Sequence, residues 1–92
     1  MNNLLELFVG GCPLCSRARE LYILGKCAGC RLVIRDLTRP KEEDLAKAKE
    51  YRIRAVPTLV INGRIRVTGV PEGPFLCSPE TYRELERLYS FR

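Results

Sequence analysis

The feature that most constrains this chain is a pair of cysteines, Cys12 and Cys15, that follows an apolar run and opens a helical segment. The run over residues 4–9 has the length and composition of a buried strand. Pro13 suits a first helical turn, where its missing N–H leaves no hydrogen bond unmade. A thiol at that position meets unpaired backbone N–H groups and the positive end of the helix dipole, which both stabilise thiolate. Because thiolate is the form that attacks disulfides, the order of strand, CxxC and helix predicts redox chemistry with Cys12 as the nucleophile.

The bulk properties predict a small folded protein. Its 92 residues suit a single domain over residues 1–92 with one modest core. No apolar run approaches the roughly 18 residues that cross a bilayer, and Glu6 interrupts an N-terminal stretch that lacks the basic start of a signal peptide. We therefore expect a cytoplasmic protein without membrane partners. The net charge of +5 is scattered rather than gathered in a basic run with aromatics, so nucleic acid is not expected and acidic protein partners are favoured.

The rest of the chain alternates between strand and helix character. Apolar residues at helical spacing predict a first helix after the cysteine pair, ending near Gly25. The later segments are a strand at 32–34, a helix from Pro40 to about Glu50, strands at 58–61 and 64–68 joined by Asn62-Gly63, and a helix after Ser78-Pro79. A strand–helix–strand unit makes a right-handed parallel pair, and the hairpin adds two antiparallel strands. The order β-α-β-α-β-β-α thus predicts an α/β fold with a four-stranded mixed sheet flanked by three helices.

Each predicted helix has an apolar face that we expect to be buried. The spacing of three and four residues between apolar side chains defines these faces. The expected inward residues are Leu14, Ala18, Leu21 and Tyr22 in the first helix, Leu45, Ala48 and Tyr51 in the second, and Tyr82, Leu85, Leu88 and Tyr89 in the third.

The element order and two motifs resemble the thioredoxin and glutaredoxin superfamily, and its small glutaredoxin-sized members most closely. The motifs are Gly11 to Cys15 after the first strand, and Ala55-Val56-Pro57-Thr58 at the start of the third. The resemblance implies a thioredoxin-like fold over nearly the whole chain and a cis peptide bond before Pro57, next to the dithiol. It implies that the Val56 backbone pairs with an extended substrate segment. The expected substrate-binding residues are Pro13, Leu14, Val56 and Pro57.

The resemblance also implies an activity. Cys12 would attack a substrate disulfide and Cys15 would resolve the mixed disulfide, as in a thiol–disulfide oxidoreductase that reduces or exchanges disulfides of protein substrates. An unidentified reductase or thiol donor would return the electrons, and no further cofactor is expected. Glu6 precedes Cys12 by six residues, which matches the buried catalytic acid beneath the thioredoxin dithiol. The resemblance assigns Glu6 the proton of the resolving thiol, and the alternative is a glutamate at a solvated sheet edge.

Three departures from the family pattern bear on the electron donor. Gly11 stands where typical thioredoxins have tryptophan, and Leu14 stands where typical glutaredoxins have an aromatic residue. Residues 68–73 lack the Gly-Gly-x-Asp-like stretch with which glutaredoxins hold glutathione. The missing stretch counts against a glutathione-linked glutaredoxin, which is the alternative within the same class.

A second cysteine pair, Cys27 and Cys30, lies outside the family pattern. With Cys12 and Cys15 it has the spacing of a four-thiolate zinc site, and either pair alone suits a carrier of soft metals such as copper or mercury. A helix of about 12 residues, roughly 18 Å long, would separate the two pairs, so no shared metal site is expected. A local Cys27–Cys30 disulfide, a second dithiol and buried thiols remain open, and Cys77 is expected to have no role.

Overall fold

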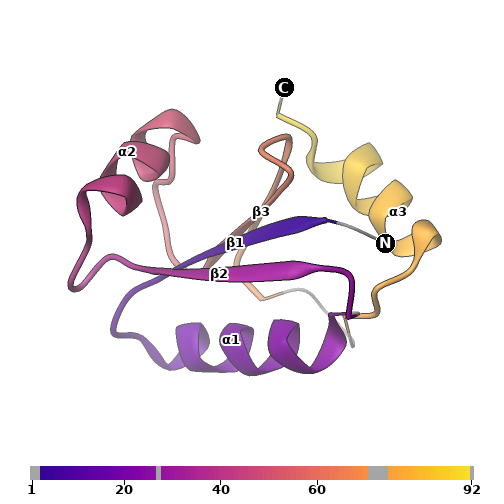
Figure 1. Ribbon diagram of the computed structural model, residues 1–92, viewed down its shortest axis with the longest axis horizontal. Coiled ribbons are helices and arrows are strands. Elements are labelled where there is room, and N and C mark those ends of the chain that lie inside the picture. The colour runs from indigo at the N-terminus through magenta and orange to yellow at the C-terminus, as the bar shows by residue number, and fades with distance from the viewer. Residues whose placement is uncertain (1–2, 27, 71–74, 92) are drawn as a thin grey trace.

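The computed structural model describes residues 3–26, 28–70 and 75–91 (Figure 1). Its elements are β1 (Leu4–Val9), α1 (Pro13–Gly25), β2 (Arg31–Asp36), α2 (Glu42–Glu50), β3 (Thr58–Ile61), β4 (Ile65–Thr68) and α3 (Pro79–Tyr89). This is the predicted α/β order, with a four-stranded mixed sheet and three helices. Among these described residues, no helix is both long and apolar enough to cross a membrane.

The sheet has the strand order β2-β1-β3-β4. Strand β1 pairs in parallel with β2 and antiparallel with β3, so it occupies the interior position that its apolar sequence predicts. The antiparallel register sets Phe8 opposite Thr58. The chain that leaves β1 toward Cys12 therefore lies beside the chain that enters β3 from Pro57.

Alternate side chains of β1 point into two different cores. Leu5 and Leu7 belong to the larger core, to which α1 contributes Tyr22 and α3 contributes Tyr82. Phe8 points to the other face and packs with Tyr51, the C-cap residue of α2. Figure 1 shows α1 and α2 on opposite sides of the sheet. The dithiol at the start of α1 and the α2 helix are thus separated by the sheet.

Four helix residues that were predicted to be buried are exposed, and the prediction was wrong at these positions. Their exposed fractions lie between 40% and 55%, for Leu14, Leu45, Leu88 and Tyr89. In α1 the buried stripe is Cys15, Ala18 and Tyr22, which leaves Leu14 on the rim. In α2 the buried helical residue is Asp44, because an arginine of β2 lies against that face of the helix. The spacing of apolar residues therefore did not identify every buried position of these short helices.

Local turn and cap signals were confirmed. Asn62 and Gly63 have positive φ values of 53° and 68°, as a type I′ hairpin requires. The Ser78 side chain accepts a hydrogen bond from the backbone N–H of Thr81, and Pro79 is the first residue of α3.

Helix α1 ends at Gly25, as predicted, but for a reason that the sequence does not reveal. A Cβ atom at this position would overlap the backbone carbonyl of Phe75. The Gly25 carbonyl also accepts a hydrogen bond of 3.2 Å from the backbone N–H of Cys77. The chain that leads into α3 is therefore held directly against the C-terminal end of α1.

Candidate functional site

Cys12 is the N-cap residue of α1. Its backbone is extended, with φ −115° and ψ 154°, and its Sγ accepts a hydrogen bond of 3.2 Å from the backbone N–H of Cys15. A side-chain acceptor at this position satisfies one of the N–H groups that a helix leaves unpaired. The Cys12 sulfur therefore lies at the positive end of the helix dipole, where negative charge is stabilised.

Cys12 and Cys15 are joined by a disulfide across the first turn of the helix, with their Cα atoms 5.2 Å apart. Cys12 is half-buried, whereas Cys15 is buried and its Sγ accepts a hydrogen bond of 3.2 Å from the Gly10 backbone N–H. The two residues thus differ in exposure, and Cys12 is the more exposed of the two.

The second family motif lies against Gly10, which closely precedes the cysteine pair. The Val56–Pro57 peptide bond is cis, and a Cβ atom on Gly10 would be only 3.1 Å from Cγ2 of Val56. An open pocket of about 280 Å³ lies beside the contact between Gly10 and Val56, and both residues line it together with Arg54 and others. Pro57 itself is buried, so contact with an approaching molecule is left to the half-buried Val56.

Leu14 and Pro13 are the two residues between the cysteines, and both are exposed. Half of the Leu14 side chain is open to solvent beside the disulfide. An exposed leucine beside the disulfide suits an apolar contact with a substrate. Substrate binding by Leu14 stays a prediction from the sequence. The structure therefore places Cys12, Cys15, Leu14 and Val56 at one end of the molecule.

A smaller pocket of about 80 Å³ lies beside Cys15, with Asp36 and Arg19 among its lining residues. Hydrogen bonds from the hydroxyl group (2.6 Å) and the backbone N–H (2.9 Å) of Thr38 lower the pKa of Asp36, and the positive charge of Arg19 lowers it further. Asp36 is thus an ionised carboxylate in the same pocket as the buried sulfur. Sequence reasoning missed this residue, because its place depends on the parallel register that sets it beside Val9.

Glu6 is placed on the opposite face of the sheet from Cys15. Its carboxylate accepts hydrogen bonds from Arg35 Nε (2.9 Å) and from the Tyr51 hydroxyl group (2.8 Å). It is 1% exposed, so the alternative of a glutamate at a solvated edge is wrong. Arg35 also binds Asp44 at 2.8 Å, which makes a buried ion cluster under α2. The proton role assigned to Glu6 stays a prediction, and the observed contacts of this residue are with the α2 side of the sheet.

Cys30 lies beyond the far end of α1 from the disulfide. The helix has 13 residues, a length of about 20 Å. Thiolate ligands of one zinc ion lie about 2.3 Å from it, so Cys30 cannot share a metal with Cys12 and Cys15. Within the described part of the chain, no group of three or more His, Cys, Asp or Glu residues is arranged to hold a metal. Cys27 and residues 71–73 lie outside the described residues, so the predictions about a Cys27–Cys30 pair and about the glutathione-binding stretch are not tested.

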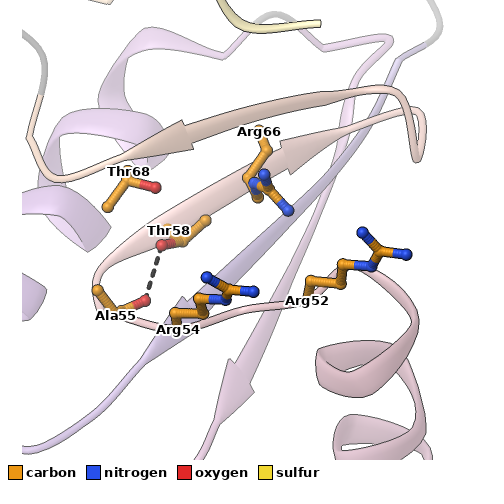
Figure 2. Close-up of a pocket in the computed structure, with 6 residues that line it drawn as sticks. All are labelled: Arg52, Arg54, Ala55, Thr58, Arg66 and Thr68. Carbon is orange, nitrogen blue, oxygen red and sulfur yellow. Dashed lines mark hydrogen bonds between the residues drawn. The ribbon is translucent and has the colours of Figure 1, made fainter. Parts of the chain in front are cut away.

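Three arginines gather around a pocket of about 260 Å³ that sequence reasoning did not foresee (Figure 2). Arg52 and Arg54 precede β3, and Arg66 comes from β4. Arg66 is held in place by a hydrogen bond of 2.6 Å to the Tyr51 carbonyl. None of the six lining residues is acidic, and Arg54 also lines the pocket beside Val56. Arginines that are scattered in the sequence therefore form a local positive surface, which Arg54 connects to the pocket beside Val56.

Comparison with known proteins agrees with this geometry. Residues 4–78 match the family described as thioredoxin domain. The chain is also similar to a protein of Acidithiobacillus ferrooxidans described as "Uncharacterized 9.0 kDa protein in mobE 3'region", with 36% identity over 62 residues. That alignment covers 66% of this chain and 69% of the other protein. The cysteine pair at the start of α1 fits a thiol-redox role. The family match covers most of the sequence, and this chain belongs to the thioredoxin superfamily.

Proposed function

We propose that this protein is a thiol–disulfide oxidoreductase that reduces or exchanges disulfides of protein substrates through Cys12 and Cys15. The observation that carries the proposal is the position of the Cys12 sulfur, which caps α1, accepts a hydrogen bond from the Cys15 N–H and belongs to the more exposed of the two cysteines. Negative charge is stabilised there by the helix dipole and by a hydrogen bond. Since the chain contains no histidine, these two interactions are the means of favouring the thiolate.

The reaction proceeds by two exchanges. The Cys12 thiolate attacks one sulfur of the substrate disulfide, and the other substrate sulfur leaves as a thiolate. The Cys15 thiol then loses its proton and attacks the Cys12 sulfur, which releases the second substrate thiolate. Two electrons have passed to the substrate, and Cys12 and Cys15 are left as the disulfide. An external thiol donor or a reductase returns the enzyme to the dithiol.

The proton of Cys15 needs an acceptor during the second exchange. The resemblance to thioredoxins assigns this role to Glu6, but Asp36 is the carboxylate that lines the pocket beside Cys15. Asp36 is ionised at neutral pH, so it can take a proton directly or through a water molecule in that pocket, and its lowered pKa means that it passes the proton on to solvent rather than keeping it. We favour Asp36 for this role.

The surface around the dithiol suggests what kind of substrate binds. Leu14 and Val56 offer apolar contacts, and the backbone of Val56 is the expected partner for an extended substrate segment. Next to them, Arg54 leads into the three-arginine pocket (Figure 2). Arginine forks bind carboxylates in a bidentate manner. Disulfides that are flanked by acidic residues are therefore the proposed substrates.

An insulin-reduction assay with dithiothreitol as the electron donor tests the assignment. We expect Cys12→Ser to abolish the activity, and we expect Cys15→Ser to accumulate a mixed disulfide between Cys12 and the substrate. Cys27→Ser is the matched control, because it removes a cysteine of the other pair, and it should retain activity. Activity that survives Cys12→Ser but not Cys27→Ser would show that the site is misassigned.

Two further measurements separate the alternatives. Activity that requires glutathione and glutathione reductase, and is absent with other thiol donors, would identify a glutathione-linked glutaredoxin. Metal analysis of protein purified under reducing conditions addresses the thiolate metal module, since about one tightly held zinc ion per chain would count heavily against redox function.

A further inference from the structure

Two cysteines far apart in the sequence meet at the end of the molecule opposite the dithiol. Cys30 directly precedes β2, and Cys77 directly precedes the cap of α3. Their Sγ atoms are 3.3 Å apart, although 47 positions separate them in the chain. Two thiols at this distance need only a small movement to become bonded.

The hydroxyl group of one tyrosine lies next to both sulfurs. Tyr82 Oη is 3.6 Å from the Cys30 sulfur, and it donates a hydrogen bond of 3.7 Å to the Cys77 sulfur. Burial raises the pKa of Tyr82, and its hydrogen bonds with the two cysteines raise it further, so the hydroxyl group stays protonated. A donor in this position stabilises negative charge on the Cys77 sulfur when that thiol ionises.

The backbone on both sides of this pair is fixed. Arg31, next to Cys30, donates a hydrogen bond of 2.9 Å to the Asn3 carbonyl, and Cys77 donates one of 3.2 Å to the Gly25 carbonyl. A disulfide bond measures about 2.05 Å, so the sulfurs must close a gap of about 1.2 Å, which side-chain rotation can supply. The fold thus presents the two thiols to each other before any bond is made.

We propose that Cys30 and Cys77 are a second redox-modification site, which a small-molecule disulfide converts into an intramolecular disulfide. Cys77 is half-buried and Cys30 is buried, so the reagent reaches Cys77 first. The Cys77 thiolate attacks the reagent and expels one thiolate, which leaves a mixed disulfide. The Cys30 thiolate then attacks the Cys77 sulfur and expels the second. One reagent disulfide is reduced to two thiols, and one protein disulfide forms.

The new bond ties the start of β2 to the start of α3. It would close a long loop in the unfolded chain, which stabilises the folded state by lowering the entropy of the unfolded one. For a chain of this size, we expect the melting temperature to rise by about 10 °C or more on oxidation. The site is separated from Cys12 and Cys15 by the length of α1, so it does not exchange electrons with them within one molecule.

The test uses the full chain with Cys12→Ser and Cys15→Ser, which leaves three cysteines. The protein is incubated with oxidised glutathione, remaining thiols are blocked with N-ethylmaleimide, and tryptic peptides are weighed. Trypsin releases residues 27–31 as one peptide, with both Cys27 and Cys30, and releases Cys77 within residues 67–83. Two further chains, which add Cys27→Ser or Cys77→Ser, therefore assign the bond.

The expected result is a disulfide that joins peptides 27–31 and 67–83, survives Cys27→Ser, is lost with Cys77→Ser and raises the melting temperature. A bond within peptide 27–31 alone, a bond that disappears with Cys27→Ser, or a product that carries only glutathione adducts would overturn the proposal. The replacements at Cys27 and Cys77 are repeated with alanine, and circular dichroism is recorded for each reduced chain. A chain that keeps its spectrum but forms no bond has lost the bond and not the fold. Because the first pair is absent from these chains, failure here leaves the proposed oxidoreductase activity unaffected.

Discussion

Replacing Arg35 is the sharpest test of how this fold is stabilised. The guanidinium group binds Glu6 at 2.9 Å and Asp44 at 2.8 Å, and the exposed side-chain fractions of these three residues are 7%, 1% and 11%. Arg35→Met keeps an unbranched apolar stem of similar reach but removes the charge. Two carboxylates then remain under α2 without their cation.

The magnitude follows from burial. Breaking a buried ion pair by removing one partner destabilises a protein by about 3–5 kcal/mol, because the remaining charge is uncompensated. The third contact of Arg35, at 3.2 Å to Glu43, is exposed on the glutamate side and adds less than about 1 kcal/mol. We therefore expect Arg35→Met to lower the free energy of unfolding by about 4 kcal/mol. A domain of this size has about 5–15 kcal/mol in total.

Urea unfolding followed by circular dichroism measures this loss, with Arg83→Met in α3 as a matched control. Arg83 is exposed, so its replacement should change the free energy of unfolding by less than about 0.5 kcal/mol. Adding Glu6→Leu to Arg35→Met removes one of the two unpaired carboxylates, and we expect the double variant to be more stable than Arg35→Met alone. A loss below about 1 kcal/mol for Arg35→Met would refute the reasoning.

The pH dependence provides an independent check. Hydrogen bonds from the Lys41 backbone and from Arg35 lower the pKa of Asp44. Its stabilising contribution is therefore complete above the unfolded-state pKa of about 3.9 and is lost as the pH falls through the lower pKa of the folded state. In Arg35→Met, a carboxylate that has lost its cation favours the protonated form. We expect the free energy of unfolding of this variant to fall as the pH rises from 4 to 7, whereas that of the unmodified protein should not. Identical pH profiles for the two proteins would contradict the proposed role of the ion cluster.

Three other predictions concern separate parts of the molecule. Gly25→Ala should destabilise the fold by about 1–3 kcal/mol in thermal unfolding, because the added methyl group meets the Phe75 carbonyl. Asp36→Asn should slow substrate release from the mixed disulfide several-fold at pH 7 in single-turnover experiments, whereas Glu6→Gln should not. Arg54→Ser should lower kcat/KM for acidic disulfide peptides more than for neutral ones, and the difference should shrink in high salt.

Features that depend on neighbouring residues were predicted well. The turn at Asn62-Gly63 and the cap at Ser78 each depend on the conformational or hydrogen-bonding preference of one or two residues. The position of Cys12 at the start of α1 depends on the short segment between strand and helix. Because these preferences are local, the sequence alone is sufficient to locate the dithiol and the order of the elements.

Features that depend on pairing between strands were not predictable in this way. Asp36 enters the Cys15 pocket through the register of β2 on β1, and Asp44 is buried because Arg35 lies opposite it. Cys77 reaches Cys30 only after the chain packs on the end of α1. A single sequence carries no direct signal for such contacts, and for that reason a residue such as Leu45 was wrongly predicted to be buried.

The two ends of α1 should give the two sulfur pairs different chemistry. At the N-terminal end, unpaired N–H groups and the positive dipole favour the Cys12 thiolate. At the C-terminal end the dipole is negative, and Cys77 is fixed there by its bond to the Gly25 carbonyl, so the helix opposes ionisation of that thiol. The Tyr82 hydroxyl group and the N-terminal end of α3, whose cap Cys77 directly precedes, act in the other direction. Cys77 therefore lies between opposing helix dipoles, whereas Cys12 meets a favourable one, so we expect faster exchange at the start of α1 than at its end.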